Sequence, residues 1–212
     1  MGKIVRFTLA NATKKLRGVS NCYAYQSNMH NLIFKGAQFT NVNYRASIIT
    51  KCNYNNTNLT GIDFIYANLK GTTFKNAHLD NVIFFGVNLA GADFKNALFN
   101  NVVFINTNTT KAKNLNISQE GITILSKYPD FILNEDLQFM LFSLIEFNKI
   151  YNYRTLHVNK NKINKWFLYL LLQEFSTSEL IRGFQALAKR KDKRHFYTLY
   201  SIKKFLYSYL KR

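Results

Sequence analysis

The chain has 212 residues, of which 47% are hydrophobic, and it contains a single proline. This composition excludes a disordered chain or a proline-rich linker, and the length suits one domain or two small ones. The formal net charge of +18 favours an anionic partner, namely nucleic acid, an acidic protein or an anionic membrane; the alternative is a solvated surface in a lysine- and asparagine-rich proteome.

The N-terminal segment carries no recognisable targeting signal. Its first six residues contain no apolar run of signal-peptide length, and Arg6 stands where the myristoylation pattern needs serine or threonine. The longest continuous apolar run, Trp166 to Leu172, is far shorter than the roughly 20 residues of a membrane-spanning helix. We therefore expect a cytoplasmic protein, with a secreted effector as the alternative, and an N-terminal cap over residues 1–16.

A period of five residues governs the next part of the chain. An apolar residue recurs at every fifth position from Val19 to Phe104, which makes 18 consecutive units. Two positions before each of these centres lies a mostly small residue, and Asn or Asp often stands between the two, as in residues 67–69 (Ala-Asn-Leu) and 92–94 (Ala-Asp-Phe). This period is typical of neither an α-helix nor an alternating strand.

The units resemble the A-(D/N)-(L/F)-x-x signature of the pentapeptide-repeat family, from about residue 17 to residue 110. The resemblance implies a right-handed quadrilateral β-helix, a β-solenoid with four units and 20 residues per coil, whose coils stack at roughly 4.8 Å. We expect the solenoid to span residues 17–115, with one large and one small residue of each unit pointing inward.

Several residues of the repeat have structural interpretations. Cys22 and Cys52 fall on the small inward position, which indicates core residues rather than a disulfide or a nucleophile. The inward Tyr44 and Tyr54 need partners for their hydroxyl groups. Two asparagine columns are interpreted as turn chemistry, because asparagine tolerates left-handed backbone and bonds to turn backbone; they are Asn21, Asn41, Asn81 and Asn101, and Asn28, Asn68, Asn88 and Asn108.

Residues 20 apart should stack above one another, so each wall of the solenoid can be examined as a column. One wall carries Lys35, Asn55, Lys75 and Lys95 outward, and we call this column the lysine wall. It is a candidate binding site for an anionic partner.

The opposite wall carries a cluster of apolar residues, here called the apolar wall. Its members are Ile65, Tyr66, Ile83, Phe85, Val103 and Ile105. A contiguous patch of this kind marks an interface. It is either the docking site of the chain's own C-terminal helices, or an external or homodimer contact.

After Phe104 the repeat fails, and the pattern predicts a small all-α bundle over residues 116–212. Helices are expected at Ser118–Lys127, from Asn134 onward, at about Lys160–Glu174, from Ser176 with a capping box, and at about Arg194–Leu210. Ile122 and Leu125 of the first of these could plug the open end of the solenoid.

Basic residues cluster between the last two predicted helices, in a segment here called the basic loop. They are Lys189, Arg190, Lys191, Lys193 and Arg194. Together with nearby tyrosines at positions 197, 207 and 209, these basic residues suit phosphate contact and base stacking. The alternative is a solvated linker with core tyrosines, and no helix-turn-helix or RNA-binding signature occurs.

The sequence shows no catalytic pattern. Its four histidines are scattered without metal-ligand spacing, and it has no phosphate-binding loop, nucleophile elbow or paired-carboxylate motif. We therefore predict no enzymatic activity, no cofactor and no metal.

Fold alone does not determine function. Family members include quinolone-resistance and toxin-immunity proteins that bind DNA gyrase and resemble DNA in negative charge, whereas the solenoid of this chain is basic. Our leading hypothesis is a non-enzymatic interaction scaffold, in which a rigid solenoid carries a basic helical module that docks an anionic partner.

That partner is expected to be another protein first, with nucleic acid, a membrane surface or a second copy of the chain as alternatives. The competing hypotheses are a topoisomerase-interacting protection or immunity protein, a nucleic-acid- or ribosome-bound component, and a host-directed effector acting at membranes.

Overall fold

The computed structural model describes residues 8–11 and 14–211, so much of the expected N-terminal cap, residues 1–7 and 12–13, lies outside the described residues. The chain divides into two compact units. One comprises Lys3–Lys127 and the other contains Tyr128–Arg212.

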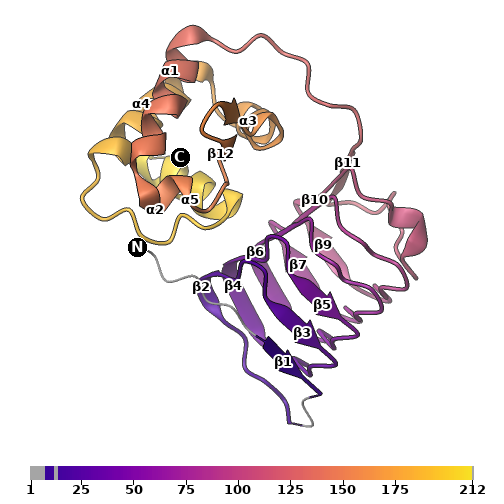
Figure 1. Cartoon of the computed structure of the whole chain (residues 1–212). Coiled ribbons are helices and arrows are strands. Elements are labelled where there is room, and N and C mark those ends of the chain that lie inside the picture. The colour runs from indigo at the N-terminus through magenta and orange to yellow at the C-terminus, as the bar shows by residue number, and fades with distance from the viewer. Residues whose placement is uncertain (1–7, 12–13, 212) are drawn as a thin grey trace. The chain divides into compact units, whose positions relative to one another are not determined.

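The first unit is a β-solenoid of about six turns, built from stacked parallel strands (Figure 1). Its elements are β1 (Thr8–Ala10), β2 (Ser20–Tyr23), β3 (Asn28–His30), β4 (Gln38–Asn43), β5 (Ile48–Thr50), β6 (Asn58–Ile65), β7 (His78–Asp80), β8 (Ile83–Phe85), β9 (Leu98–Asn100), β10 (Val102–Ile105), the 3₁₀-helix η1 (Thr109–Lys111) and β11 (Ile122–Leu125). Partners in adjacent strands are 20 residues apart, as in Phe64, Phe84 and Phe104. The predicted coil of four five-residue units is therefore confirmed.

The large residues of the repeat form ring columns in the core. Phe64 stacks on Phe84 with centroids 5.2 Å apart, and Phe84 stacks on Phe104 at 4.7 Å with planes 7° apart. A second column runs from Tyr54 through Phe74 to Phe94. These rings are all at most 1% exposed, which confirms that the repeat centres point inward.

Left-handed residues turn the corners between walls. Asn21, Asn41, Asn81 and Asn101 have φ between 51° and 54°, and the Asn101 amide donates to the Asn81 side-chain oxygen at 2.6 Å. Asparagine tolerates this backbone better than most residues, so the first predicted asparagine column is confirmed as turn chemistry.

The second asparagine column bonds to turn backbone without being left-handed. The side-chain oxygen of Asn68 accepts from the amide of Lys70, and that of Asn88 accepts from the amide of Ala90, both at 3.1 Å. Both asparagine columns therefore serve the turns of the solenoid, as predicted, but through different contacts.

The helix predicted over Ser118–Lys127 is wrong. Residues 122–125 form strand β11, which pairs in parallel with β10. The edge of β10 supplies backbone partners, because the Val102 amide donates to the Gly121 carbonyl at 2.8 Å. Ile122 packs against the solenoid core, so it does help to close that end, although as part of a strand.

The second unit is mainly helical. Its elements are α1 (Glu135–Ser143), the 3₁₀-helix η2 (Leu144–Glu146), α2 (Asn148–Tyr151), β12 (His157–Asn159), β13 (Lys162–Ile163), α3 (Lys165–Leu172), α4 (Thr177–Lys189) and α5 (Leu199–Leu210). Helix α4 packs against both α1 and α5. The interior of this unit includes four fully buried side chains from different helices, namely Leu141, Phe167, Phe184 and Leu206.

Capping residues set where these helices begin. Asn134 accepts from the Leu137 amide at 3.0 Å, and Ser176 forms a capping box with Glu179, so both predicted starts are confirmed. Helix α3 begins later than predicted because β12 and β13 form an antiparallel hairpin just before it. Helix α5 begins at Leu199, after the cap Thr198, rather than at Arg194.

Candidate interaction surfaces

The lysine wall is one continuous column. The carbonyls of Asn55, Lys75 and Lys95 accept hydrogen bonds from the corner residues of the preceding coils at 2.9 Å. Lys35 and Lys95 are exposed, and Lys75 is half-buried. The structure therefore places the three predicted lysines on the same wall.

Lys75 is paired with an acid on that wall. Its Nζ lies 3.2 Å from the Asp93 carboxylate. Burial alone would raise the pKa of Asp93, but hydrogen bonds from Asn114 and from the Lys95 amide, together with Lys75, hold the pKa below its usual value. Asp93 is therefore ionised at neutral pH and neutralises part of the wall.

Two further lysines extend the wall beyond the predicted set. A line of backbone bridges runs from Lys15 through Ile33, Asn53, Thr73 and Asp93 to Lys113, beside the lysine column. Lys15 and Lys113 are both exposed. Lys113 follows Asp93 by the regular 20 residues, so the repeat could have placed it on this wall. Lys15 precedes Ile33 by only 18 residues, so the regular spacing does not predict its place.

The apolar wall is also assembled as predicted. Ile83 pairs with Val103 in one column. In the other column, Phe85 pairs with Ile65 on one side and with Ile105 on the other. These five residues are at most 8% exposed. They form two adjacent columns of one sheet.

Tyr66 differs from the rest of the apolar wall because it is 55% exposed. It stands at a corner with φ 52°, and its ring lies 5.0 Å from that of Phe85. The guanidinium of Arg45 lies 5.7 Å from the Tyr66 ring centroid. The tyrosine is thus held between a cation and a second ring.

The basic loop is ordered by its own contacts. The Arg194 guanidinium donates two hydrogen bonds of 2.9 Å to the two oxygens of Asp192. These bonds hold the pKa of the Asp192 carboxyl well below its usual range. Arg190 donates to the Asp192 carbonyl at 2.5 Å, and Lys193 donates to the Arg190 carbonyl.

Two of these cations also lie over aromatic rings of the helical unit. Lys193 is 4.3 Å from the Phe147 ring centroid, and Arg190 is 5.8 Å from that of Phe205. Lys189 and Lys191 are exposed. The five basic residues therefore lie together, but three of them contribute to the local structure, which the sequence did not reveal.

The tyrosines near the basic loop have structural contacts as well. The Tyr207 hydroxyl donates to Glu174 at 2.6 Å, and the ring of Tyr197 packs at 4.5 Å against that of Tyr153. Tyr209 stacks on Phe205 at 6.1 Å and is 48% exposed. Of the three, Tyr209 presents the largest surface.

The two cysteines are buried in the solenoid core, and two of the histidines are hydrogen-bonded within the fold. Burial raises the pKa of both Cys22 and Cys52 to about 11. His30 hydrogen-bonds Thr50 at 2.7 Å, and His157 hydrogen-bonds the Leu141 carbonyl at 2.8 Å. Within residues 8–11 and 14–211, no group of three or more His, Cys, Asp or Glu could hold a metal ion.

None of the helices in the described part of the chain is long and apolar enough to cross a membrane.

Known proteins share the repeat but match only part of the chain. The family described as pentapeptide repeats matches residues 49–81 and 83–113 in 8 copies. No curated protein sequence matches the chain.

Solved structures with similarity include a trypsin-treated QnrB1, a plasmid-mediated fluoroquinolone resistance protein, with 16% identity over 54% of this chain and 55% of that one and a TM-score of 0.36. Rfr23 from the cyanobacterium Cyanothece 51142 has 18% identity over 50% of this chain and 59% of its own, with a TM-score of 0.23. HetL from Nostoc sp. strain PCC 7120, involved in heterocyst differentiation regulation, has 18% identity over 52% and 56%, with a TM-score of 0.23. The chain spans a little more than half the length of each.

The family match covers the coils whose five-residue units, inward rings and 20-residue register are described above. It ends before β11 and leaves the helical unit unassigned. The solenoid is therefore built from pentapeptide repeats.

Proposed function

We propose that this protein is a non-enzymatic interaction scaffold that binds an anionic macromolecule through its basic surfaces. The lysine wall is the principal surface, and the exposed lysines of the basic loop are the second. The observation that carries the proposal is the alignment of Lys35, Lys75 and Lys95 on one wall, with Lys15 and Lys113 beside them.

A rigid support makes such a wall effective. Isolated backbone bridges and hydrogen bonds between the turns of adjacent coils hold the lysine backbones at roughly the 4.8 Å spacing of a parallel sheet. An extended polyanion that follows the stack therefore meets several cations at once. Binding of this kind is driven by electrostatic attraction and counterion release, so it weakens steeply with salt.

The absence of enzymatic activity is part of the proposal. It is supported by what the reactive side chains do: both cysteines are core residues with raised pKa values, and His30 and His157 are hydrogen-bonded within the fold. Polar groups such as Asp80, which accepts from Asn100 at 2.6 Å, link neighbouring coils.

The experiment is a binding titration with three defined probes: a single-stranded DNA oligonucleotide, heparin and a polyglutamate peptide. The lysine-wall variant Lys35→Gln/Lys75→Gln/Lys95→Gln is compared with Lys51→Gln/Lys70→Gln/Lys111→Gln, which removes the same charge from another wall. We expect the first variant to weaken binding at least tenfold and to lower the salt slope by about two to three. The control should change both by much less.

A third variant, Lys189→Gln/Lys191→Gln, tests the basic loop separately. Equal weakening by all three variants would mean that net charge alone attracts anions, which contradicts a specific surface. The probe that binds best identifies the class of partner: oligonucleotide points to nucleic acid, and polyglutamate points to an acidic protein. A chain that binds none of the probes at low salt would overturn the proposal.

A further inference from the structure

The ring column that includes Tyr44 ends one coil before the N-terminal end of the solenoid. Tyr44 stacks on Phe64 with centroids 5.4 Å apart and planes 9° apart, and the stack continues through Phe84 to Phe104. The preceding coil has Ala24 at this position, where the next four coils have the rings of Tyr44, Phe64, Phe84 and Phe104.

The backbone continues across this position without interruption. The Ala24 amide donates to the carbonyl of Asn43 at 2.9 Å, as the stacked coils do elsewhere, and Tyr23 is in register with Asn43. Ala24 therefore occupies the place of a repeat centre but supplies only a methyl group. The face of the Tyr44 ring that points toward this coil has no ring from residue 24 to cover it.

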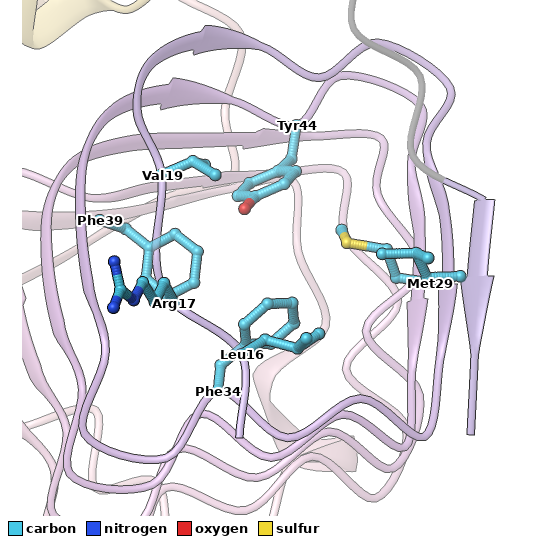
Figure 2. A pocket seen from close by; sticks show the side chains of 8 residues that line it. Leu16, Arg17, Val19, Met29, Phe34, Phe39 and Tyr44 are labelled. Atoms are coloured by element: carbon cyan, nitrogen blue, oxygen red, sulfur yellow. The ribbon is translucent and has the colours of Figure 1, made fainter. Parts of the chain in front are cut away.

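A cavity of about 140 Å³ lies at this end of the core (Figure 2). Its lining residues are Leu9, Leu16, Arg17, Val19, Met29, Phe34, Phe39 and Tyr44. In Figure 2 the side chains of Met29, Phe34, Phe39 and Tyr44 surround the opening, with the aromatic rings on separate sides. Among these described residues, only Arg17 and the hydroxyl group of Tyr44 are polar.

The irregular first coil contributes to the cavity. Leu9 pairs with Met29 at the usual spacing of 20 residues, but the Leu16 amide donates to Ile33, a shorter offset than in the other coils. Leu16 and Val19 are only partly buried. Among the described residues of this end of the solenoid, Leu9, Leu16 and Val19 therefore border the cavity without filling it.

The size and lining define the class of ligand. An enclosed apolar cavity of roughly 150 Å³ admits a ring of the size of benzene, so this cavity has room for one such ring. Aromatic rings gain an additional 0.5–1.5 kcal/mol, roughly, from stacked or edge-to-face contacts at about 4.5–7 Å, and the cavity offers the rings of Phe34, Phe39 and Tyr44. An aliphatic ring of equal size would gain only the burial.

We propose that this cavity binds a small, flat, uncharged aromatic molecule, whose ring packs against the rings of Phe34, Phe39 and Tyr44 that line it. None of the residues that line this cavity belongs to the lysine wall or to the basic loop. Binding in the cavity does not depend on the proposed function.

The test is a titration of the full chain with fluorobenzene, followed by fluorine NMR, with benzene and cyclohexane as competitors. The wild-type protein should bind fluorobenzene saturably, and benzene should compete at least threefold better than cyclohexane. The variant Ala24→Phe supplies the missing ring and should weaken fluorobenzene binding at least tenfold. The matched control His78→Phe adds the same side chain at an exposed position and should leave the affinity unchanged.

A second variant keeps the test decisive if Ala24→Phe does not fold, which circular dichroism would reveal. Tyr44→Leu retains an apolar lining but removes one of the three rings, so it should reduce the preference for benzene over cyclohexane. Absence of saturable binding to the wild type overturns the proposal, as does wild-type affinity in a folded Ala24→Phe variant. An unchanged preference for benzene in a folded Tyr44→Leu variant also overturns it.

Discussion

Gly18 lies against the backbone of Gln38 so closely that a Cβ atom on Gly18 would stand 1.6 Å from the Gln38 carbonyl oxygen and 2.5 Å from its carbon. Gly18 lies between two contacts with the next coil. The Leu16 amide donates to the Ile33 carbonyl, and the Val19 carbonyl accepts from the Thr40 amide. The corner is shorter than the others in the solenoid. Only a residue without a side chain fits it.

Substituting Gly18→Ala should therefore destabilise the N-terminal coil. The obstructing atoms are backbone, so the strands must move apart, and we expect a loss of about 2 kcal/mol or more. Urea unfolding monitored by circular dichroism measures the loss. Gly91→Ala is the control, because a Cβ atom there meets nothing within 4 Å. It should lower the free energy of unfolding by only about 1 kcal/mol, since alanine disfavours the left-handed backbone at this position. Equal losses of stability in the two variants would contradict the close contact between Gly18 and the Gln38 backbone.

Removing one ring from the stacked column should be costly throughout the solenoid. Phe84 is fully buried, with its ring 5.2 Å from that of Phe64 and 4.7 Å from that of Phe104. We expect Phe84→Ala to lower the free energy of unfolding by about 3–5 kcal/mol, through lost burial and the cavity left behind. Leu98→Ala, at a position that is 53% exposed, should cost less than about 1 kcal/mol. A small effect at Phe84 would mean that the coils collapse around the gap.

The two cysteines should be inert in the folded protein. Burial raises the pKa of Cys22 and Cys52 to about 11, so almost none of either thiol is ionised at pH 8, and the thiolate is the reactive form. A chromogenic disulfide reagent should label neither native cysteine within minutes but both after denaturation. A Lys95→Cys variant adds an exposed thiol that should react at once. Rapid labelling of the native wild type would show that the coils open.

The helical unit should lose stability in mild acid because of His157. Burial and the nearby Arg154 lower its pKa and outweigh the hydrogen bond to the Leu141 carbonyl. The folded state therefore resists protonation, whereas the unfolded histidine binds a proton near its ordinary pKa of about 6.5. Stability is full above that pH and falls below it, by up to about 1.4 kcal/mol per pH unit.

The fluorescence of Trp166, the single tryptophan, reports unfolding of this unit between pH 7 and pH 5. His157→Gln retains a hydrogen-bond donor but does not titrate, so its stability should depend less on pH. His78→Gln, at an exposed position of the solenoid, should behave like the wild type. If His157→Gln retains the full dependence, another group is responsible.

Several features could be predicted from neighbouring residues alone. The five-residue period determined the inward residues, such as Phe84, because every unit makes the same contacts with the coils on either side. Asn134 and Ser176 marked two helix starts, since capping depends on amides two or three residues away. The placement of Lys35, Lys75 and Lys95 on one wall followed from the same period.

Other features depended on partners distant in the sequence. Residues 122–125 are mostly apolar, a pattern compatible with a helix or a strand, and the edge of β10 favours the strand because it offers backbone partners. Nothing in the sequence indicates that the cations of the basic loop have partners. In the structure Arg194 pairs with Asp192, Arg190 lies over the Phe205 ring and Lys193 lies over the Phe147 ring. The cavity beside Tyr44 likewise needed the course of the irregular first coil.

The sequence by itself thus determined the repeat, its register and the composition of each wall, because these follow from a strict local period. Only the tertiary structure decided how the repeat ends, which cations contact other parts of the chain, and where the core remains unfilled. The physical reason is that repeat units interact only with their immediate neighbours. Ends and loops, in contrast, are stabilised by whichever surfaces the rest of the chain brings to them.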